Sequence, residues 1–328
     1  MSELKTLFNI SASPHVRDSL TVKRIMWEVN LALAPATLFS CWWFGFAAIK
    51  TYLICIIACV LTEWIIQKAR GVAITIDDGS AFLTGLLLAM NIPPEIPWYM
   101  PVVGSIAAIG IAKHTMGGLG HNIFNPALIG RAFLLASWPI AMTTWSEMVS
   151  RVDGVTRATP LGILKLHGYE QVVNTFGNTA TMYKDLFFGF RNGSMGETSV
   201  LLLLLGGLFL IWRGHINWQV PAVMIATVGI FTWVFGGTAG FFSGDGLFHI
   251  LSGGLFLGAF FMATDMVTIP ITVRGQMVFA LGCGLIVALV RLKGGYPEGV
   301  CYSILLMNAC APLIDRVIRP KKYGAGGK

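Results

Sequence analysis

The chain has 328 residues, of which 55% are hydrophobic and only 12% are charged, whereas about 25% of the residues in ordinary soluble domains are charged. Such a chain could not bury its apolar surface in one aqueous core, so the composition excludes an ordinary soluble globular domain. The net charge of +7 does not indicate nucleic-acid binding, because most basic residues flank hydrophobic segments, as topology signals in membrane proteins do.

The long apolar runs predict an all-α polytopic membrane protein with about ten transmembrane helices, because a helix satisfies its own backbone hydrogen bonds in lipid. Residues 1–24 are expected to be a cytoplasmic N-terminal segment, without the apolar stretch of a cleavable signal. Residues 25–139 are expected to form the first transmembrane half, with spans near 25–44, 47–66, 80–92, 98–112 and 124–139.

Residues 140–197 form the only sizeable polar segment between the apolar runs. We expect a loop on the outer, periplasmic or extracytoplasmic, face of the membrane. Loops of this length usually carry a function.

The second transmembrane half is expected at 198–315, followed by a basic cytoplasmic tail at 316–328. Its spans are predicted near 198–213, 217–235, 248–263, 275–291 and 299–315. The spans at 80–92 and 248–263 are short and contain glycine, and the span at 124–139 carries Pro126 and Arg131. Short or interrupted spans at matching places in two halves are typical of proteins with a site near the membrane midplane.

A weak internal repeat relates the two halves. Asp78-Gly79 precedes the short span of the first half, and Asp245-Gly246 precedes that of the second. A long helix then follows in each half, ending at Lys113 or near Lys293. Five spans per half would give the halves opposite orientations, so we expect an inverted repeat. The excess of lysine and arginine in the terminal segments predicts that both termini are cytoplasmic in a bacterial inner membrane.

The polar segment contains the run Asp153-Gly154-Val155-Thr156-Arg157-Ala158-Thr159-Pro160. A turn is the simplest interpretation, because Asp-Gly favours a bend and hydroxyl side chains cap it. Two features go beyond a turn. Pro160 favours an extended backbone at Thr159, and the small Ala158 would leave the Thr159 hydroxyl open to a modifying enzyme.

Asp153, Thr156, Ala158 and Thr159 resemble the flavinylation motif Asp-x-x-Ser/Thr-Gly-Ala-Thr, whose last threonine carries FMN through a phosphoester bond. The resemblance implies that Thr159 is the attachment residue. Arg157 stands where the motif usually has glycine. The arginine could slow or prevent the modification, or it could add a cation near the FMN phosphate.

Four further stretches resemble the D-subunit family of the ion-translocating Rnf electron transport complex, namely residues 13–16, 25–36, 120–128 and 262–265. That family is related to the B subunit of the sodium-translocating NADH:quinone reductase. The resemblance extends from about residue 13 to residue 316.

This resemblance implies a membrane electron-transfer subunit that carries covalent FMN in a ferredoxin:NAD⁺ oxidoreductase and couples redox chemistry to Na⁺ or H⁺ transport. A flavin suits this role because it accepts one or two electrons. The chain would supply position and is not expected to be catalytic alone. The implied partners are the outer-face flavoprotein RnfG, the small membrane proteins RnfA and RnfE, and the iron–sulfur proteins RnfB and RnfC.

A second flavin site is also implied, because the related quinone reductase holds riboflavin without a covalent bond. By similarity, Asn122 and Asn125 could belong to such a pocket, and they could equally cap the span that follows them. Asp265 lies beside a short span, where a charge is costly, and is a candidate for a flavin contact or an ion path. No Cys-x-x-Cys or Cys/His cluster supports a metal site.

Two alternatives to an electron carrier remain. A channel or solute transporter without a redox cofactor would fit the inverted repeat and the triplet Asn125-Pro126-Ala127, which is familiar from water channels, although the second half has Asn308-Ala309-Cys310 at the corresponding end. A structural protein without a cofactor stays open because of Arg157.

Overall fold

The computed structural model of the chain describes residues 20–145, 159–190, 193–237 and 240–320, and within these ranges every regular element is helical. The elements of the first half are α1 (Val22–Phe44), α2 (Phe46–Ala69), η1 (Ile76–Asp78), α3 (Ser80–Met90), α4 (Tyr99–Ile106), η2 (Ala107–His114), α5 (Pro126–Ser137) and α6 (Pro139–Thr143). Three helices and a short 3-10 turn follow, α7 (Pro160–His167), α8 (Tyr169–Phe176), α9 (Thr179–Phe188) and η3 (Met195–Glu197). The second half contains α10 (Val200–Trp212), α11 (Gln219–Phe235), α12 (Gly246–Leu251), α13 (Leu255–Leu257), η4 (Gly258–Met262), α14 (Val273–Lys293) and α15 (Val300–Val317).

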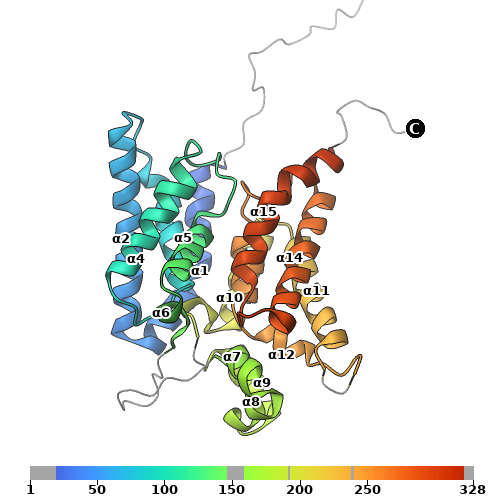
Figure 1. Cartoon of the computed structure of the whole chain (residues 1–328). Coiled ribbons are helices and arrows are strands. Elements are labelled where there is room, and N and C mark those ends of the chain that lie inside the picture. Colours follow the sequence, from blue (N-terminus) through green and yellow to red (C-terminus); the bar gives the residue numbers. More distant parts are fainter. Residues whose placement is uncertain (1–19, 146–158, 191–192, 238–239, 321–328) are drawn as a thin grey trace, which may run out of the picture.

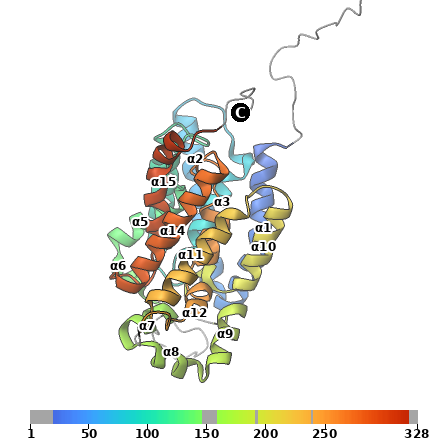
Figure 2. The same ribbon diagram turned by 90° about the vertical axis from the view of Figure 1, so that its right-hand side faces the viewer.

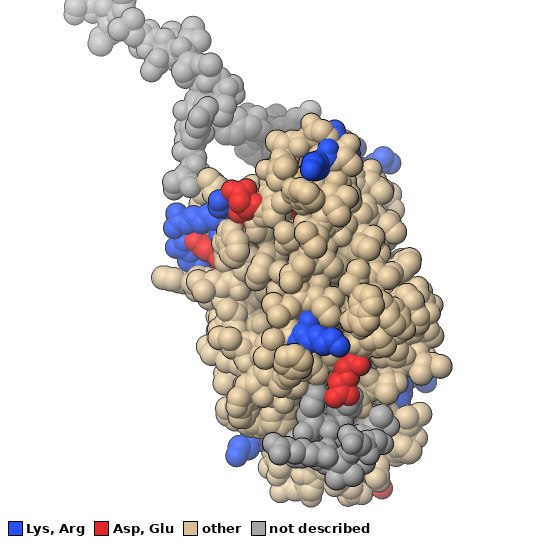
Figure 3. All heavy atoms as spheres, turned by 90° about the vertical axis from the view of Figure 1, so that its left-hand side faces the viewer, with Lys and Arg blue, Asp and Glu red and all other residues tan. Residues whose placement is uncertain are grey.

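The helices fit a multi-pass membrane protein. Among the described residues, α2, α14 and α15 are long and apolar enough to cross a membrane, and α3, α5, α10 and α11 are shorter apolar helices. Large apolar side chains such as Leu38, Trp42 and Phe46 are exposed, as expected for a surface that faces lipid. Charged side chains are few on the face drawn in Figure 3, and most of that face consists of other residues. Helices occur at each place where the sequence predicts a span, and the number of ten membrane crossings stays a prediction.

The short and interrupted helices lie where the glycine-bearing segments predict them. Helix α3 ends after 11 residues, at Met90, and the segment that follows Asp245 is divided into α12, α13 and η4. Gly253, with a φ of +69°, separates α12 from α13. A Cβ atom at Gly253 would lie 2.8 Å from the Glu298 carboxylate, so both the backbone conformation and the space favour glycine at this break.

The same packing order occurs in both halves. Helix α2 packs against α3 and α4, and α11 packs against α12 and α14. Helix α4 also packs against α5, as α14 does against α15, while α1 of the first half packs against α10 of the second. Helix α1 begins at the end of the molecule opposite α7–α9, whereas α10 begins after them (Figures 1 and 2). The first helices of the two halves therefore run in opposite directions, as in an inverted repeat.

Helices α7, α8 and α9 form a cap at the end of the molecule opposite the start of α1 and the end of α15 (Figure 1). The polar composition of this segment predicts a loop there and does not reveal these helices. The side chains of Thr159 and Asn178 cap the first turns of α7 and α9, and α7, α8 and α9 end at Gly168, Gly177 and Gly189. Thr159 was interpreted only as part of a turn, although capping residues and glycines of this kind are also helix-start and helix-stop signals.

Asp245 connects this cap to the second half through hydrogen bonds. Its Oδ2 atom accepts hydrogen bonds from the Tyr169 hydroxyl at 2.6 Å and the Tyr183 hydroxyl at 2.5 Å. Its Oδ1 atom accepts from the Phe248 N–H at 2.9 Å and so caps α12. Burial, together with Asp245, raises the pKa of the Tyr183 phenol above its usual value, so this hydroxyl keeps its proton and acts as a donor.

We expect Asp245→Ala to weaken the docking of α8 and α9 by about 2 kcal/mol or more, because it removes two hydrogen bonds to a carboxylate and a helix cap. Limited proteolysis of the detergent-solubilised protein would measure this as faster cleavage within residues 160–190. Glu170→Ala, at an exposed position of α8, is the control. Cleavage at the wild-type rate in Asp245→Ala would contradict the assigned role.

Candidate functional site

Thr159 lies at the N-cap of α7. Its backbone is extended, with a φ of −60° and a ψ of 158°, as Pro160 predicts, and its hydroxyl accepts a hydrogen bond from the Gly162 N–H at 3.2 Å. The side chain is only 5% exposed, so the expectation of an open hydroxyl is contradicted. Capping draws the hydroxyl back onto the first turn of α7, where helix N–H groups lack other partners. Asp153, Thr156, Arg157 and Ala158 lie outside the described residues.

Thr159 nevertheless lines a cavity of about 230 Å³ between the cap and both halves. We call it the α7 cavity. Its wall includes Arg131 from α5, Trp145, Thr159 and Lys165 from α7, and Tyr296 and Glu298 from the segment between α14 and α15. The cavity thus places a threonine hydroxyl beside aromatic rings and two cations. Rings that can pack against a planar group and cations that can face an anion suit a phosphorylated aromatic molecule such as FMN.

Arg131, which the sequence analysis marked only as a charge within a span, is an anchor between the two halves. One guanidinium nitrogen donates to Asn91 Oδ1 at 2.9 Å, and the other donates to Glu298 Oε2 at 2.8 Å. Glu298 also accepts a hydrogen bond from the Gly254 N–H at 3.3 Å. Because Arg131 and Glu298 are 167 residues apart in the chain, the sequence could indicate the need for a partner but not which residue it is.

Lys165 has a different environment in the same cavity. Its ammonium donates to the Val290 carbonyl at 3.2 Å and to the Tyr296 carbonyl. In the part of the chain that the structure describes, no carboxylate forms an ion pair with it. Lys165 could not be singled out from the sequence, because its segment was expected to be a loop and its carbonyl partners come from distant residues.

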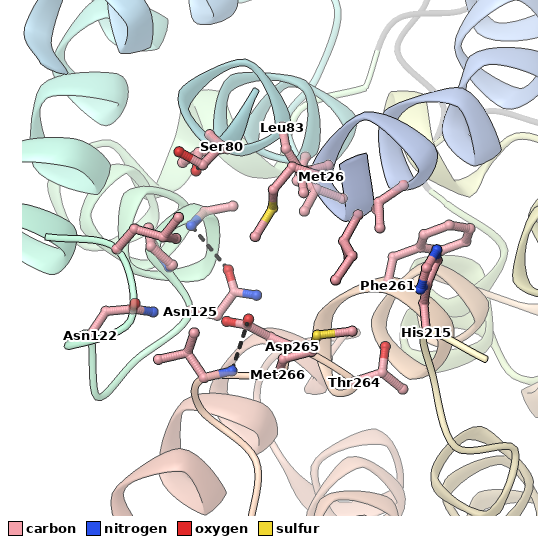
Figure 4. A pocket seen from close by; sticks show the side chains of 18 of the residues that line it. Met26, Ser80, Leu83, Asn122, Asn125, His215, Phe261, Thr264, Asp265 and Met266 are labelled. Carbon is pink, nitrogen blue, oxygen red and sulfur yellow. Dashed lines mark hydrogen bonds between the residues drawn. The ribbon is translucent and has the colours of Figure 1, made fainter. Parts of the chain in front are cut away.

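A second cavity, of about 100 Å³, lies between the two halves and contains all three residues that the sequence analysis associated with a second flavin or an ion path (Figure 4). We call it the Asn125 cavity. Asn122 and Asn125 reach it from the segment before α5, and Asp265 reaches it from the segment after η4. The Asp265 carboxylate accepts from the Val267 N–H at 3.4 Å and the Thr268 hydroxyl at 3.3 Å.

The two asparagines have different roles. Asn125 is the N-cap of α5, because its Oδ1 accepts from the N–H groups of Ala127 at 3.1 Å and Leu128 at 3.4 Å. The Oδ1 atom of Asn122 is buried and has no hydrogen-bond partner among the described residues. A buried polar atom without a partner costs free energy, so the Asn122 carbonyl is a ready acceptor for a bound molecule.

Lys113 also lines the Asn125 cavity, and its charge is neutralised. Its ammonium lies 2.7 Å from a Glu63 carboxylate oxygen and 2.7 Å from the Ser80 hydroxyl, with both members of the ion pair buried. Glu63 lies within the span predicted at 47–66, and its partner is 50 residues away in the chain. The pair joins α2, α3 and η2.

Polar contacts connect the two cavities. Asn91, which Arg131 binds at the α7 cavity, donates to the sulfur of Met262 at 3.7 Å. Asn125 donates to the carbonyl of the same Met262 at 3.4 Å. A buried line of side chains from both halves therefore runs from one cavity to the other through Met262.

Comparisons with known proteins identify relatives of the whole chain. The model of the NQR2, RnfD, RnfE family matches residues 9–324. The chain is 62% identical over 321 residues to the D subunit of the proton-translocating ferredoxin:NAD(+) oxidoreductase complex of Clostridium ljungdahlii, covering 98% of this chain and 97% of the relative. It is 46% identical over 328 residues to the D subunit of the Na(+)-translocating ferredoxin:NAD(+) oxidoreductase complex of Acetobacterium woodii (99% and 97% covered). It is 41% identical over 337 residues to the D subunit of the ion-translocating oxidoreductase complex of Stutzerimonas stutzeri (94% of each chain).

Proposed function

This chain belongs to the NQR2, RnfD, RnfE family, and from that premise we propose that it is the D subunit of an ion-translocating ferredoxin:NAD⁺ oxidoreductase and carries FMN on Thr159. The names of the relatives support the place in the complex. One relative is named for protons and another for Na⁺, so the proposal covers ion translocation without naming the ion. The observation that carries the FMN proposal is the Thr159 hydroxyl on the wall of a cavity that also presents Arg131 and Lys165.

Attachment would form a bond between Thr159 Oγ1 and the phosphorus of FMN, with loss of the hydroxyl proton. The donor would be a flavin dinucleotide, from which a nucleoside monophosphate leaves, so that atoms balance. Once Oγ1 is esterified, the Gly162 N–H that it now accepts from can donate to a phosphate oxygen instead. The N-terminus of α7 favours such an anion, because free N–H groups and the helix dipole both point to it.

When bound, the flavin supplies uptake and release of one or two electrons. The residues of this chain would hold it in place: Trp145 and Tyr296 offer rings for packing, and Arg131 and Glu298 fix the wall between the halves. We place the α7 cavity on the outer face of the bacterial inner membrane, with both termini in the cytoplasm. The start of α1 and the end of α15 at the opposite end of the molecule support this orientation (Figure 2).

We further propose that the other Rnf proteins implied by the resemblance assemble around this chain: the outer-face flavoprotein RnfG near the cap, the small membrane proteins RnfA and RnfE in lipid, and the iron–sulfur proteins RnfB and RnfC. The exposed apolar side chains of the bundle support contacts with lipid and with membrane-embedded partners.

The test of the proposal is the fluorescence of the protein in a denaturing gel, together with its intact mass. The chain is expressed with a flavin transferase, purified and fully denatured, which releases any flavin that is not covalently bound. We expect a fluorescent band and a mass increase of one FMN less one water. A dark band with an unmodified mass would contradict the electron-carrier function and favour a structural protein or a channel without a redox cofactor.

We also propose that the Asn125 cavity holds a second, non-covalent flavin of the riboflavin type. The unpaired carbonyl oxygen of Asn122 supports this, because the flavin ring system carries N–H donors that could satisfy it. Asp265, which also lines the cavity, offers further acceptors, and Phe261 offers an aromatic ring. Asn125 would contribute by fixing the start of α5, since its side chain is already used as a cap.

We expect Asn122→Leu to lower the non-covalent flavin content roughly tenfold, the effect of one lost hydrogen bond and of a polar contact replaced by an apolar one. The measurement is the flavin released into the supernatant when the protein is denatured. The covalent FMN, which stays on the polypeptide, serves as the internal reference. Asn217→Leu, at an asparagine that does not line this cavity, is the matched control. Equal release from Asn122→Leu and wild type would exclude Asn122 as a flavin contact.

A further inference from the structure

Among its described lining residues, the α7 cavity has two cations, Arg131 and Lys165, and one carboxylate, Glu298. Arg131 is paired with Glu298 at a separation of 2.8 Å. Within the described ranges, the hydrogen bonds of Lys165 go to the carbonyl oxygens of Val290 and Tyr296, and carbonyl oxygens satisfy its N–H groups without cancelling its charge. Among the described residues that line the cavity, Arg131, Lys165 and Glu298 are the charged ones and Tyr296 is a further titratable one.

Partial burial makes this charge costly. Removal from water lowers the pKa of Lys165 below its usual value, the direction expected for a cation that lacks a counter-charge. A structural lysine at this position would be expected to lie closer to Glu298 or to turn into solvent. Lys165 instead lies at the cavity wall, where a negatively charged group of a bound molecule could pair with it.

The geometry relates Lys165 to Thr159. The two residues lie six positions apart along α7 and line the same cavity, with a rise of about 9 Å along the axis at 1.5 Å per residue. Side chains on a helix point back toward its N-terminus, which here is the end that holds Thr159. Gly162, midway between them, also lies on the cavity wall and has no side chain to separate the ammonium from the space next to the threonine.

We propose that Lys165 is the positioning residue that supplies the counter-charge to the phosphodiester of the FMN carried by Thr159. This inference rests on the proposed function. The phosphodiester is the only permanently charged group of an FMN attached in this way, with one negative charge, and it would balance the excess positive charge of the α7 cavity. Arg131 is not this counter-charge, because Glu298 already neutralises it.

The titration of Lys165 tests the proposal without reference to enzyme activity. The flavin-bearing protein and the Thr159→Val protein are treated with an amine-acylating reagent over a range of pH, and modification of Lys165 is followed by mass spectrometry. A phosphodiester about 10 Å or less away should raise the midpoint of the Lys165 titration by about one pH unit. The midpoint of Lys184, which is exposed on α9, should be the same in both proteins.

The titration separates the possible outcomes. Steric shielding by a flavin would lower the extent of modification at every pH without moving the midpoint, and that result would overturn the proposal. An unchanged midpoint in protein whose mass shows FMN on Thr159 would also overturn it, while the proposed function would stand. Absence of FMN from the wild type would refute the proposed function and this inference together.

A pair of variants gives a second readout. Lys165→Gln should reduce the fraction of chains that carry FMN several-fold, because the anionic product loses its counter-charge, and Lys165→Arg should restore it. Lys184→Gln is the matched control and should leave the fraction unchanged. A merely structural lysine would not show rescue by charge, since Lys165→Gln retains donors for the Val290 and Tyr296 carbonyls. Full FMN content in Lys165→Gln would contradict the proposal.

Discussion

Thr159→Val is expected to abolish the covalent flavin completely. Valine has nearly the shape of threonine but lacks the oxygen that would bond to phosphorus. The variant also loses the hydrogen bond from the Gly162 N–H to Oγ1, which should cost about 0.5–2 kcal/mol of stability as a lost helix cap. That cost is small enough for the protein to fold and insert. The gel band should therefore be present at normal intensity by protein stain and dark by fluorescence.

Two further variants test whether the Thr159 hydroxyl is the attachment point of the flavin. Thr159→Ser keeps a hydroxyl and a capping group, so fluorescence should return. Thr143→Val removes a second threonine hydroxyl of the α7 cavity, one that donates to the Pro139 carbonyl at 2.8 Å, and should leave the band bright. A fluorescent band in Thr159→Val would show that another residue carries the flavin.

Arg131→Met should be the most destabilising substitution among those considered. Arg131 and Glu298 have side chains that are 11% and 9% exposed, and methionine would take the paired cation from the Glu298 carboxylate and the donor from the Asn91 carbonyl oxygen. Loss of one partner from a buried ion pair costs about 3–5 kcal/mol. The expected result is a clearly lower midpoint of thermal unfolding in detergent, with less FMN attached because the cavity wall between the halves is disturbed.

The double variant Arg131→Met, Glu298→Leu tests whether the loss of stability comes from the carboxylate of Glu298 left without Arg131. The second substitution removes the carboxylate that Arg131→Met leaves without its arginine, so the double variant should be more stable than Arg131→Met alone. Lys23→Met breaks an exposed pair, with side chains of Lys23 and Asp77 that are 55% and 76% exposed, and should have little effect because water screens such pairs. A double variant as unstable as the sum of its two single variants would contradict the assigned ion pair.

Much of the bundle could be predicted from the sequence because membrane helices need long apolar runs. The expected spans at 25–44 and 275–291 correspond to α1 (Val22–Phe44) and α14 (Val273–Lys293), and the glycines near Gly253 correctly indicated an interrupted helix. The helices of the cap were missed because they are only 8 to 10 residues long, too short for periodicity to distinguish from turns.

Only the parts of the candidate sites that belong to local motifs could be predicted from the sequence. Local motifs marked Thr159, Asn122, Asn125 and Asp265, and the structure brings the last three together in one cavity. The partners that complete the sites come from distant parts of the chain: Glu298 for Arg131, and the segment containing Val290 and Tyr296 for Lys165. Such long-range pairs depend on how the two halves pack, which residue spacing does not encode. The burial of Thr159 likewise depends on the α7 cap, which the turn interpretation omitted.

The identity of the peptide that carries FMN is the most direct measure of the central proposal. Trypsin cleaves after arginine and lysine, so it should release residues 158–165 from between Arg157 and Leu166, and Thr159 is the only hydroxyl-bearing residue in that peptide. In protein isolated from its native complex, this peptide should carry the added mass of one FMN less one water and should fluoresce. A bare 158–165 peptide, or the added mass on any other peptide, would contradict the attachment of FMN to Thr159.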